Sequence, residues 1–282
     1  MRHGRNGPPY GFGFLRPGLA VRKLVMMGTS QSAATLRNYL AVHATLRLAN
    51  GDPIYDGYLP TSTAGDTPMP RIDVPLIQIP TQTEVERAAA AGNPYRRDDG
   101  DEPGNQFRLY EMAGMPHNDS RENPTYAAGF CDLPMSMFPV GALMSVGLHH
   151  LVSWVDRGVV PPRASRIEVD RDTSGDGSLL ALDEHGNAKG GVRNTYVDVP
   201  IAKHGVPNRA DPVPGTRNDF YCGIAGYELR LPDETLRRLY RDARDYRDKV
   251  DARLRQLIDE GWFLPIYADQ VTANAIAVTF GE

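Results

Sequence analysis

The sequence predicts an α/β fold in which helices flank a mostly parallel sheet. Apolar runs bounded by turn residues predict four strands, at 24–28, 55–61, 74–80 and 107–114. The first run leads through a turn of small residues into a helical pattern at 34–42. Polar side chains suited to catalysis follow three of the four strands. In open parallel sheets such groups gather in the crevice beyond the carboxyl ends of the strands, so the pattern predicts one site at that edge.

The turn after the first strand has the layout of a nucleophile elbow. It reads Gly28-Thr29-Ser30-Gln31-Ser32, with Ser30 at the apex between small residues that permit a sharp turn from strand to helix. Ser32 stands where the G-x-S-x-G motif has its second glycine. The following helix leaves the backbone N–H of Gln31 at a helix N-terminus, where it can donate to a developing oxyanion. The alternative is a turn rich in serine and threonine that only caps the helix.

A carboxylate follows the third strand. That strand, at 74–80, is bounded by prolines and runs into a short polar stretch that ends at Glu84. This placement just past the end of a strand makes Glu84 the expected acid of a catalytic triad. Asp56 and Asp66, near the second strand, are alternative acids, and Glu86 is a weaker one.

A histidine follows the fourth strand. His117 lies in the loop after the strand at 107–114. A serine hydroxyl is a poor nucleophile until a neighbouring base accepts its proton, and His117 is the expected base for Ser30. Glu84 is then expected to hold the opposite ring nitrogen, which fixes the tautomer and stabilises the imidazolium.

These features together resemble the alpha/beta hydrolase family, whose chain order is serine, acid, histidine. The elbow at Ser30, the stretch 111–114 before His117 and the glycine-rich stretch 186–193 are similar to a poorly characterised group of alpha/beta hydrolase domain proteins. The similarity runs from the first predicted strand to the C-terminus. The resemblance implies an esterase-like serine hydrolase that acts on a small ester-like substrate and needs no cofactor.

The chain departs from the family pattern at its N-terminus. Only 29 residues precede Ser30, whereas the family's elbow follows several earlier strands. Residues 1–21 are rich in glycine, proline and arginine and read as an irregular segment, so the hydrolase-like domain at 22–282 is expected to lack the N-terminal strands of the fold. No segment resembles the loop that supplies the second oxyanion donor. A truncated reading frame is the favoured explanation, ahead of a partner chain or a compact variant.

Two expectations follow from the missing strands. The strand at 24–28 would present an unpaired edge through which the chain can form a homo-oligomer. The second expectation is an alternative function: a truncated or non-catalytic hydrolase-fold protein that binds a partner or completes its sheet with another chain.

The other elements follow from periodicity and breakers. The sequence predicts an exposed loop at 88–104, a helix at 139–157 and a β-hairpin excursion near 167–202. It also predicts one long helix at 233–260 with a charged, solvated face, and a short last helix at 268–277.

Composition excludes several classes of function. The net charge is −4, and no basic face with interleaved aromatic residues is present, so nucleic-acid binding is not expected. The longest apolar stretch, at 138–148, is too short for a membrane span. The stretch 2–22 lacks the apolar centre of a signal peptide, and the compartment stays open.

The two cysteines, Cys131 and Cys222, leave two alternatives. They pair in an oxidising compartment, or they remain buried thiols, which is the commoner fate of isolated cysteines. Neither has a cysteine or histidine at metal-ligand spacing, so no metal site is expected.

Overall fold

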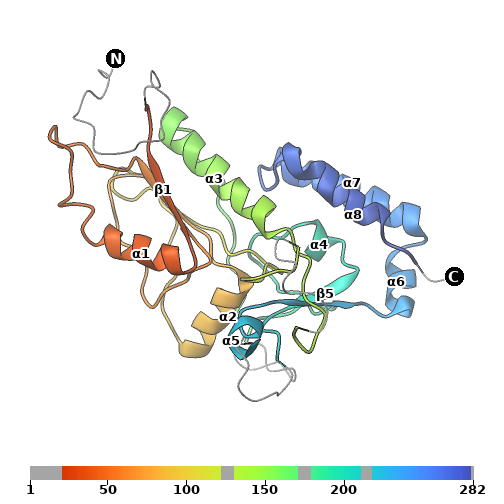
Figure 1. Cartoon of the computed structure of the whole chain (residues 1–282). Coiled ribbons are helices and arrows are strands. Elements are labelled where there is room, and N and C mark those ends of the chain that lie inside the picture. The colour runs from red at the N-terminus through yellow and green to blue at the C-terminus, as the bar shows by residue number, and fades with distance from the viewer. Residues whose placement is uncertain (1–20, 122–129, 171–178, 211–217, 281–282) are drawn as a thin grey trace.

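The four predicted strands form one parallel sheet. The computed structural model describes residues 21–121, 130–170, 179–210 and 218–280 (Figure 1), so the predicted irregular segment lies almost wholly outside the described residues. The strands pair in sequence order: β1 (Val25–Thr29), β2 (Gly57–Thr61), β3 (Leu76–Gln78) and β4 (Phe107–Leu109). Because all four run the same way, their carboxyl ends meet at one edge of the sheet.

Helices cover both faces of the sheet. The helices α1 (Gln31–Leu40) and α2 (Gln82–Ala91) contribute to the core on one face, and α3 (Val140–Arg157) packs on the other (Figure 1). Neighbouring residues of a strand serve opposite faces, since Tyr58 belongs to the α1 cluster and Leu59 to the α3 cluster. Every residue of β2, β3 and β4 is therefore buried, as is typical of parallel strands.

β1 lies at the edge of the sheet. Within the described ranges it pairs with β2 alone, in the register that sets Val25 opposite Gly57 and Thr29 opposite Thr61. The side chain of Met27, in the middle of β1, is 44% exposed, unlike any residue of the inner strands. Among the described residues β1 is therefore an edge strand, and association of two chains through this edge stays a prediction.

The C-terminal helices enlarge the core on the α3 side of the sheet. They pack side chains into the same hydrophobic cluster as α3 and lie beside one another at one end of the molecule (Figure 1). They are α6 (Asp233–Leu239), α7 (Ala243–Asp259), the short 3₁₀ turn η2 (Pro265–Tyr267) and α8 (Ala268–Ile276). The predicted helices at 139–157 and 268–277 are confirmed as α3 and α8. None of the helices in the described ranges is long and apolar enough to cross a membrane.

The prediction of one helix at 233–260 is wrong. The backbone is extended at Tyr240, and the Tyr240 hydroxyl donates a hydrogen bond to the Pro200 carbonyl at 2.9 Å. The side chain of Asp242 then accepts a hydrogen bond from the Asp245 N–H at 2.8 Å and caps a new helix. An anchored tyrosine and an N-cap residue therefore divide the pattern into α6 and α7.

The predicted β-hairpin excursion is present as isolated antiparallel bridges. They join Ile167 to Gly190, Val169 to Leu180, and Leu182 to Ala188. The short helix α4 (Thr195–Asp198) ends the excursion, and residues 171–178 within it lie outside the described residues.

A second, two-stranded sheet follows the excursion. The strands β5 (Ala202–Gly205) and β6 (Tyr227–Arg230) pair antiparallel, and α5 (Asn218–Cys222) lies between them in sequence. Cys131 and Cys222 form a disulfide with their Cα atoms 5.8 Å apart. Of the two alternatives that the sequence leaves open, the structure has the disulfide, because the fold brings the two cysteines within the span that a disulfide needs.

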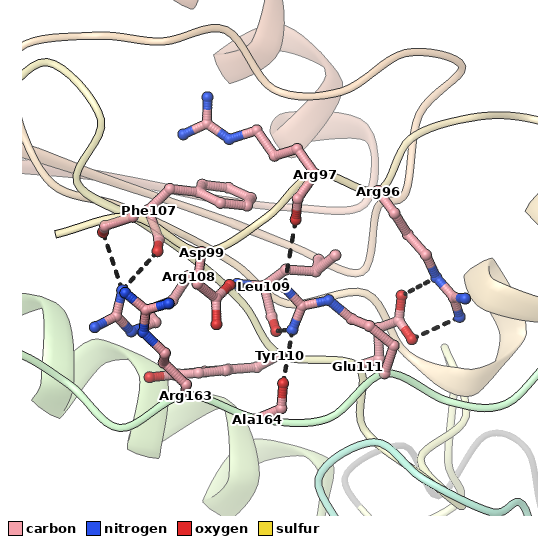
Figure 2. Close-up of polar contacts among 12 residues, drawn as sticks. Arg96, Arg97, Asp99, Phe107, Arg108, Leu109, Tyr110, Glu111, Arg163 and Ala164 are labelled. Atoms are coloured by element: carbon pink, nitrogen blue, oxygen red, sulfur yellow. Dashed lines mark hydrogen bonds and ion pairs between the residues drawn. The ribbon is translucent and has the colours of Figure 1, made fainter. Parts of the chain in front are cut away.

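The expectation of an exposed loop at 88–104 is wrong in its central part. α2 extends to Ala91, and Tyr95 is buried with its hydroxyl on the carboxylate of Glu111, just beyond β4. Figure 2 shows Arg96 meeting the same carboxylate through two parallel hydrogen bonds, of 2.7 and 2.8 Å. Burial raises the pKa of the Tyr95 phenol, as does the charge of Glu111, so the phenol stays protonated and donates.

The Glu111 carboxylate also anchors the excursion to the sheet. It accepts the Ile167 N–H at 2.7 Å, while Arg96 donates to the Ile167 carbonyl at 2.7 Å. Glu111 is fully buried, and its charge is compensated by these donors. The end of β4, from which the next loop starts, is thereby fixed on two sides.

Candidate active site

Ser30 occupies a strained position between β1 and α1. Its backbone has φ 55° and ψ −119°, a conformation that a residue other than glycine rarely adopts. Its N–H donates to the carbonyl of Thr61 on β2 at 3.1 Å, and α1 begins at the next residue, Gln31. The serine hydroxyl is thus carried on a sharp turn at the carboxyl edge of the sheet, as the sequence predicts.

The residues on either side explain why this turn forms. A Cβ at Gly28 would lie 2.6 Å from the carbonyl oxygen of Ser32, so only glycine fits there. Ser32 does more than replace a glycine: its hydroxyl accepts the Thr29 N–H at 2.8 Å and donates to the Thr29 carbonyl at 2.8 Å. These two bonds close the turn locally, which accounts for a serine at this position.

Glu84 lies in the first turn of α2. Thr81 caps this helix in a capping box, in which the Glu84 side chain reaches back to the N-cap. One carboxylate oxygen, Oε2, accepts the Thr81 N–H at 3.0 Å and the Thr81 hydroxyl at 2.5 Å. The other oxygen, Oε1, lies 2.5 Å from Nδ1 of His117. The helix cap therefore aims the carboxylate at the histidine.

The loop that carries His117 is held against the same turn of α2. The Gly114 N–H donates to the Gln82 side chain at 2.6 Å, and the Gln82 N–H donates to the Met115 carbonyl at 2.8 Å. The His117 N–H itself donates to the hydroxyl of Thr83 at 3.1 Å. Three consecutive residues, 82–84, thus each bind this loop. Within the part of the chain that the structure describes, Nδ1 is the ring nitrogen of His117 that has a hydrogen bond, and Nε2 has none.

The structure brings two of the three predicted catalytic side chains into direct contact. Glu84 and His117 are hydrogen-bonded, and their side chains are 11% and 12% exposed, which partly shields the pair from water. Ser30 lies at the end of β1, two strands from β3, and among the described contacts no hydrogen bond joins its hydroxyl to His117. In uncomplexed enzymes this bond is often long and tightens only with substrate.

The alternative acids lie elsewhere. Asp56 precedes β2, at the opposite edge of the sheet, and accepts the Leu24 N–H at 2.8 Å. Asp66 accepts a hydrogen bond from the side chain of Asn93 at 3.0 Å. Glu86 accepts the Leu179 N–H at 2.8 Å. None of these contacts involves the histidine, so Glu84 is the carboxylate that the geometry favours.

Sequence reasoning missed the residues that hold the triad candidates in place. Thr81, Gln82 and Thr83 bind either the carboxylate or the histidine loop. One signal was available, since the spacing Thr81-x-x-Glu84 is that of a capping box and predicts a helix start. No local signal marks Gln82 and Thr83, because their partners are over 30 residues away. In the described ranges no group of three or more histidine, cysteine or acidic residues is placed to hold a metal ion.

Comparison of the sequence with known proteins agrees with this geometry. A family model described as "Alpha/beta hydrolase domain" matches residues 6–273, nearly the whole chain. The same comparison finds no curated protein and no solved structure that matches this chain. The resemblance predicted from the elbow and the residues after the strands is thus confirmed at the level of the family. The chain belongs to the alpha/beta hydrolase domain family.

Proposed function

We propose that this protein is a serine hydrolase that cleaves carboxylic esters through an acyl-enzyme on Ser30. One observation carries the proposal: the His117–Glu84 hydrogen bond of 2.5 Å lies at the same edge of the sheet as the strained Ser30. A histidine held by a carboxylate, at the same sheet edge as a serine on a sharp turn, belongs to the arrangement that activates a hydroxyl nucleophile.

The geometry supports a role for each group. Because Nδ1 of His117 is engaged by Glu84, Nε2 is the nitrogen that accepts the proton of Ser30 during attack on the ester carbonyl. Glu84 stabilises the imidazolium that results. His117 then gives its proton to the leaving alcohol, and the same base activates the water that releases the acid from Ser30.

The tetrahedral intermediate needs donors for its oxyanion. The N–H of Gln31 is the proposed donor, since Gln31 is the first residue of α1 and the first N–H groups of a helix have no partner within it. The proposed substrate is a small ester, and the proposed chemistry is complete without a cofactor.

Activity-based labelling tests this proposal. A fluorophosphonate reacts with an activated serine, so we expect the full chain to be labelled and the modified peptide, found by mass spectrometry, to contain Ser30. Ser30→Ala abolishes the label. The matched control is Ser62→Ala, because Ser62 also has a positive φ, of 50°, at a strand end but is only 3% exposed. Label that persists in Ser30→Ala would assign another nucleophile, and absence of label on the folded chain would favour the non-catalytic alternative.

A further inference from the structure

His117 has a second support, opposite α2. Its sequence neighbour Asn118 donates to the Ile224 carbonyl at 3.3 Å and accepts the Gly226 N–H at 3.3 Å. On the other side of His117, Pro116 packs so closely on Gly226 that a Cβ there would lie 2.5 Å from the proline Cβ. The segment Ile224–Gly226 therefore contacts the residues on both sides of the histidine.

The disulfide lies directly beside this segment. Cys222 ends α5, and the Ala225 N–H donates to the Cys222 carbonyl at 3.1 Å. Cys131, Cys222 and Ala225 form a small buried cluster of their own, separate from the cores around the main sheet. From the Cys131 side, the Ser136 N–H donates to the Gly226 carbonyl at 3.2 Å. Both arms of the disulfide thus reach the segment that supports His117.

Among the residues that the structure describes, the cluster around the disulfide is small. Its buried members are Cys131, Cys222 and Ala225, and the partly buried Phe130, Met135 and Ala210 pack against them. The disulfide joins positions 91 residues apart in sequence, and a link of that span removes much conformational freedom from the open chain. The covalent bond therefore ties together two distant parts of the chain that meet beside the His117 loop.

We propose that the Cys131–Cys222 disulfide is a positioning element for His117, so that the rate of ester hydrolysis depends on its redox state. The inference rests on the proposed function. Reduction by a dithiol transfers two electrons and two protons to the disulfide. The sulfur–sulfur bond breaks, each cysteine gains a proton, and the dithiol closes to its own disulfide. The freed segment Ile224–Gly226 then moves away from the loop, while the α2 side of the site stays in place.

The experiment compares the oxidised full chain, the same chain reduced with dithiothreitol, and the double variant Cys131→Ala/Cys222→Ala. Steady-state hydrolysis of p-nitrophenyl butyrate gives kcat and KM, and thiol titration and circular dichroism establish the redox state and the fold. We expect kcat to fall at least tenfold on reduction and in the double variant, with KM changed less than twofold. Reoxidation restores kcat in the wild-type chain and not in the variant.

A disulfide that only stabilises the fold gives a different result. Its reduction lowers the melting temperature, while kcat measured below the unfolding transition is unchanged. That result, with two free thiols titrated, overturns the inference and leaves the hydrolase proposal intact. If the double variant folds poorly, hydrogen exchange on the wild-type chain gives a second test. On reduction, we expect the backbone amides of Asn118 and Gly226 to exchange faster. Unchanged exchange rates also overturn the inference. An oxidised chain with neither turnover nor fluorophosphonate label overturns the hydrolase proposal and this inference with it.

Discussion

Single residues at the candidate site adopt conformations that the rest of the fold enforces. Ser30 has a positive φ, which costs of the order of 1–3 kcal/mol for a residue with a side chain. Gly28 and Ser32 make the turn possible, one by having no side chain and the other by closing it with two hydrogen bonds. Such strain is characteristic of functional sites, where it presents one side chain to a ligand.

The carboxylate of Glu84 is the residue whose role is simplest to isolate. In Glu84→Gln the amide no longer stabilises an imidazolium at His117, and we expect kcat to fall about 10²–10⁴-fold with little change in KM. Glu86→Gln, two residues along α2, is the matched control. Glu86 accepts the Leu179 N–H, which an amide oxygen can also accept, so this variant keeps its activity. The measurement is kcat for ester hydrolysis by both variants. An equal loss of kcat in the two would refute a special role for Glu84.

At the scale of elements, local patterns predicted what depends on local contacts. The four strands of a mostly parallel sheet follow from short apolar runs, and the candidate site follows from polar residues after strands β1, β3 and β4. The Glu84–His117 contact was predictable because parallel strands in sequence order bring their carboxyl ends to one edge. This part of the architecture needs no information beyond periodicity and turn residues.

Elements that depend on distant partners were not predictable. The periodicity at 233–260 is continuous, but Tyr240 leaves the helix to reach the Pro200 carbonyl, 40 residues earlier. The polar stretch at 88–104 carries breakers and charges, yet Tyr95 and Arg96 turn inward because Glu111 supplies a buried partner. Tertiary hydrogen bonds override local propensity in both cases.

The pairing of the cysteines and the second sheet belong to the same class. β5 and β6 lie over 20 residues apart, and Cys131 and Cys222 are separated by 91 residues. The sequence alone does not show that β5 pairs with β6 or that the two cysteines form a disulfide, because no local signal in either segment points to its distant partner.

For the whole molecule, a buried histidine links stability to pH. His204 on β5 is 3% exposed, and its ring packs against Phe138 and Tyr196. Burial lowers the pKa of His204 to about 4, from 6.5 when exposed. Between these values the unfolded chain binds a proton that the folded chain does not. The free energy of unfolding therefore falls as the pH is lowered from 6.5 to 4, by about 3 kcal/mol from this group.

The variant His204→Phe tests this linkage, because it keeps the aromatic packing and removes the titrating group. Urea unfolding from pH 7 to pH 4 compares the two chains, so that contributions of all other groups cancel. We expect the loss of stability over this range to be smaller in the variant by about 3 kcal/mol. Parallel pH dependences would show that His204 is not the group responsible.

The proposed hydrolase forms an acyl-enzyme on Ser30, and rapid-quench mass spectrometry with p-nitrophenyl butyrate detects such an intermediate. We expect a butyryl group on the Ser30 peptide within the first turnover. We also expect His117→Asn to slow the formation of this acyl-enzyme and Ser30→Ala to abolish it. Hydrolysis of the ester at an undiminished rate in Ser30→Ala, or an acyl group on any other residue, would show that Ser30 is not the nucleophile.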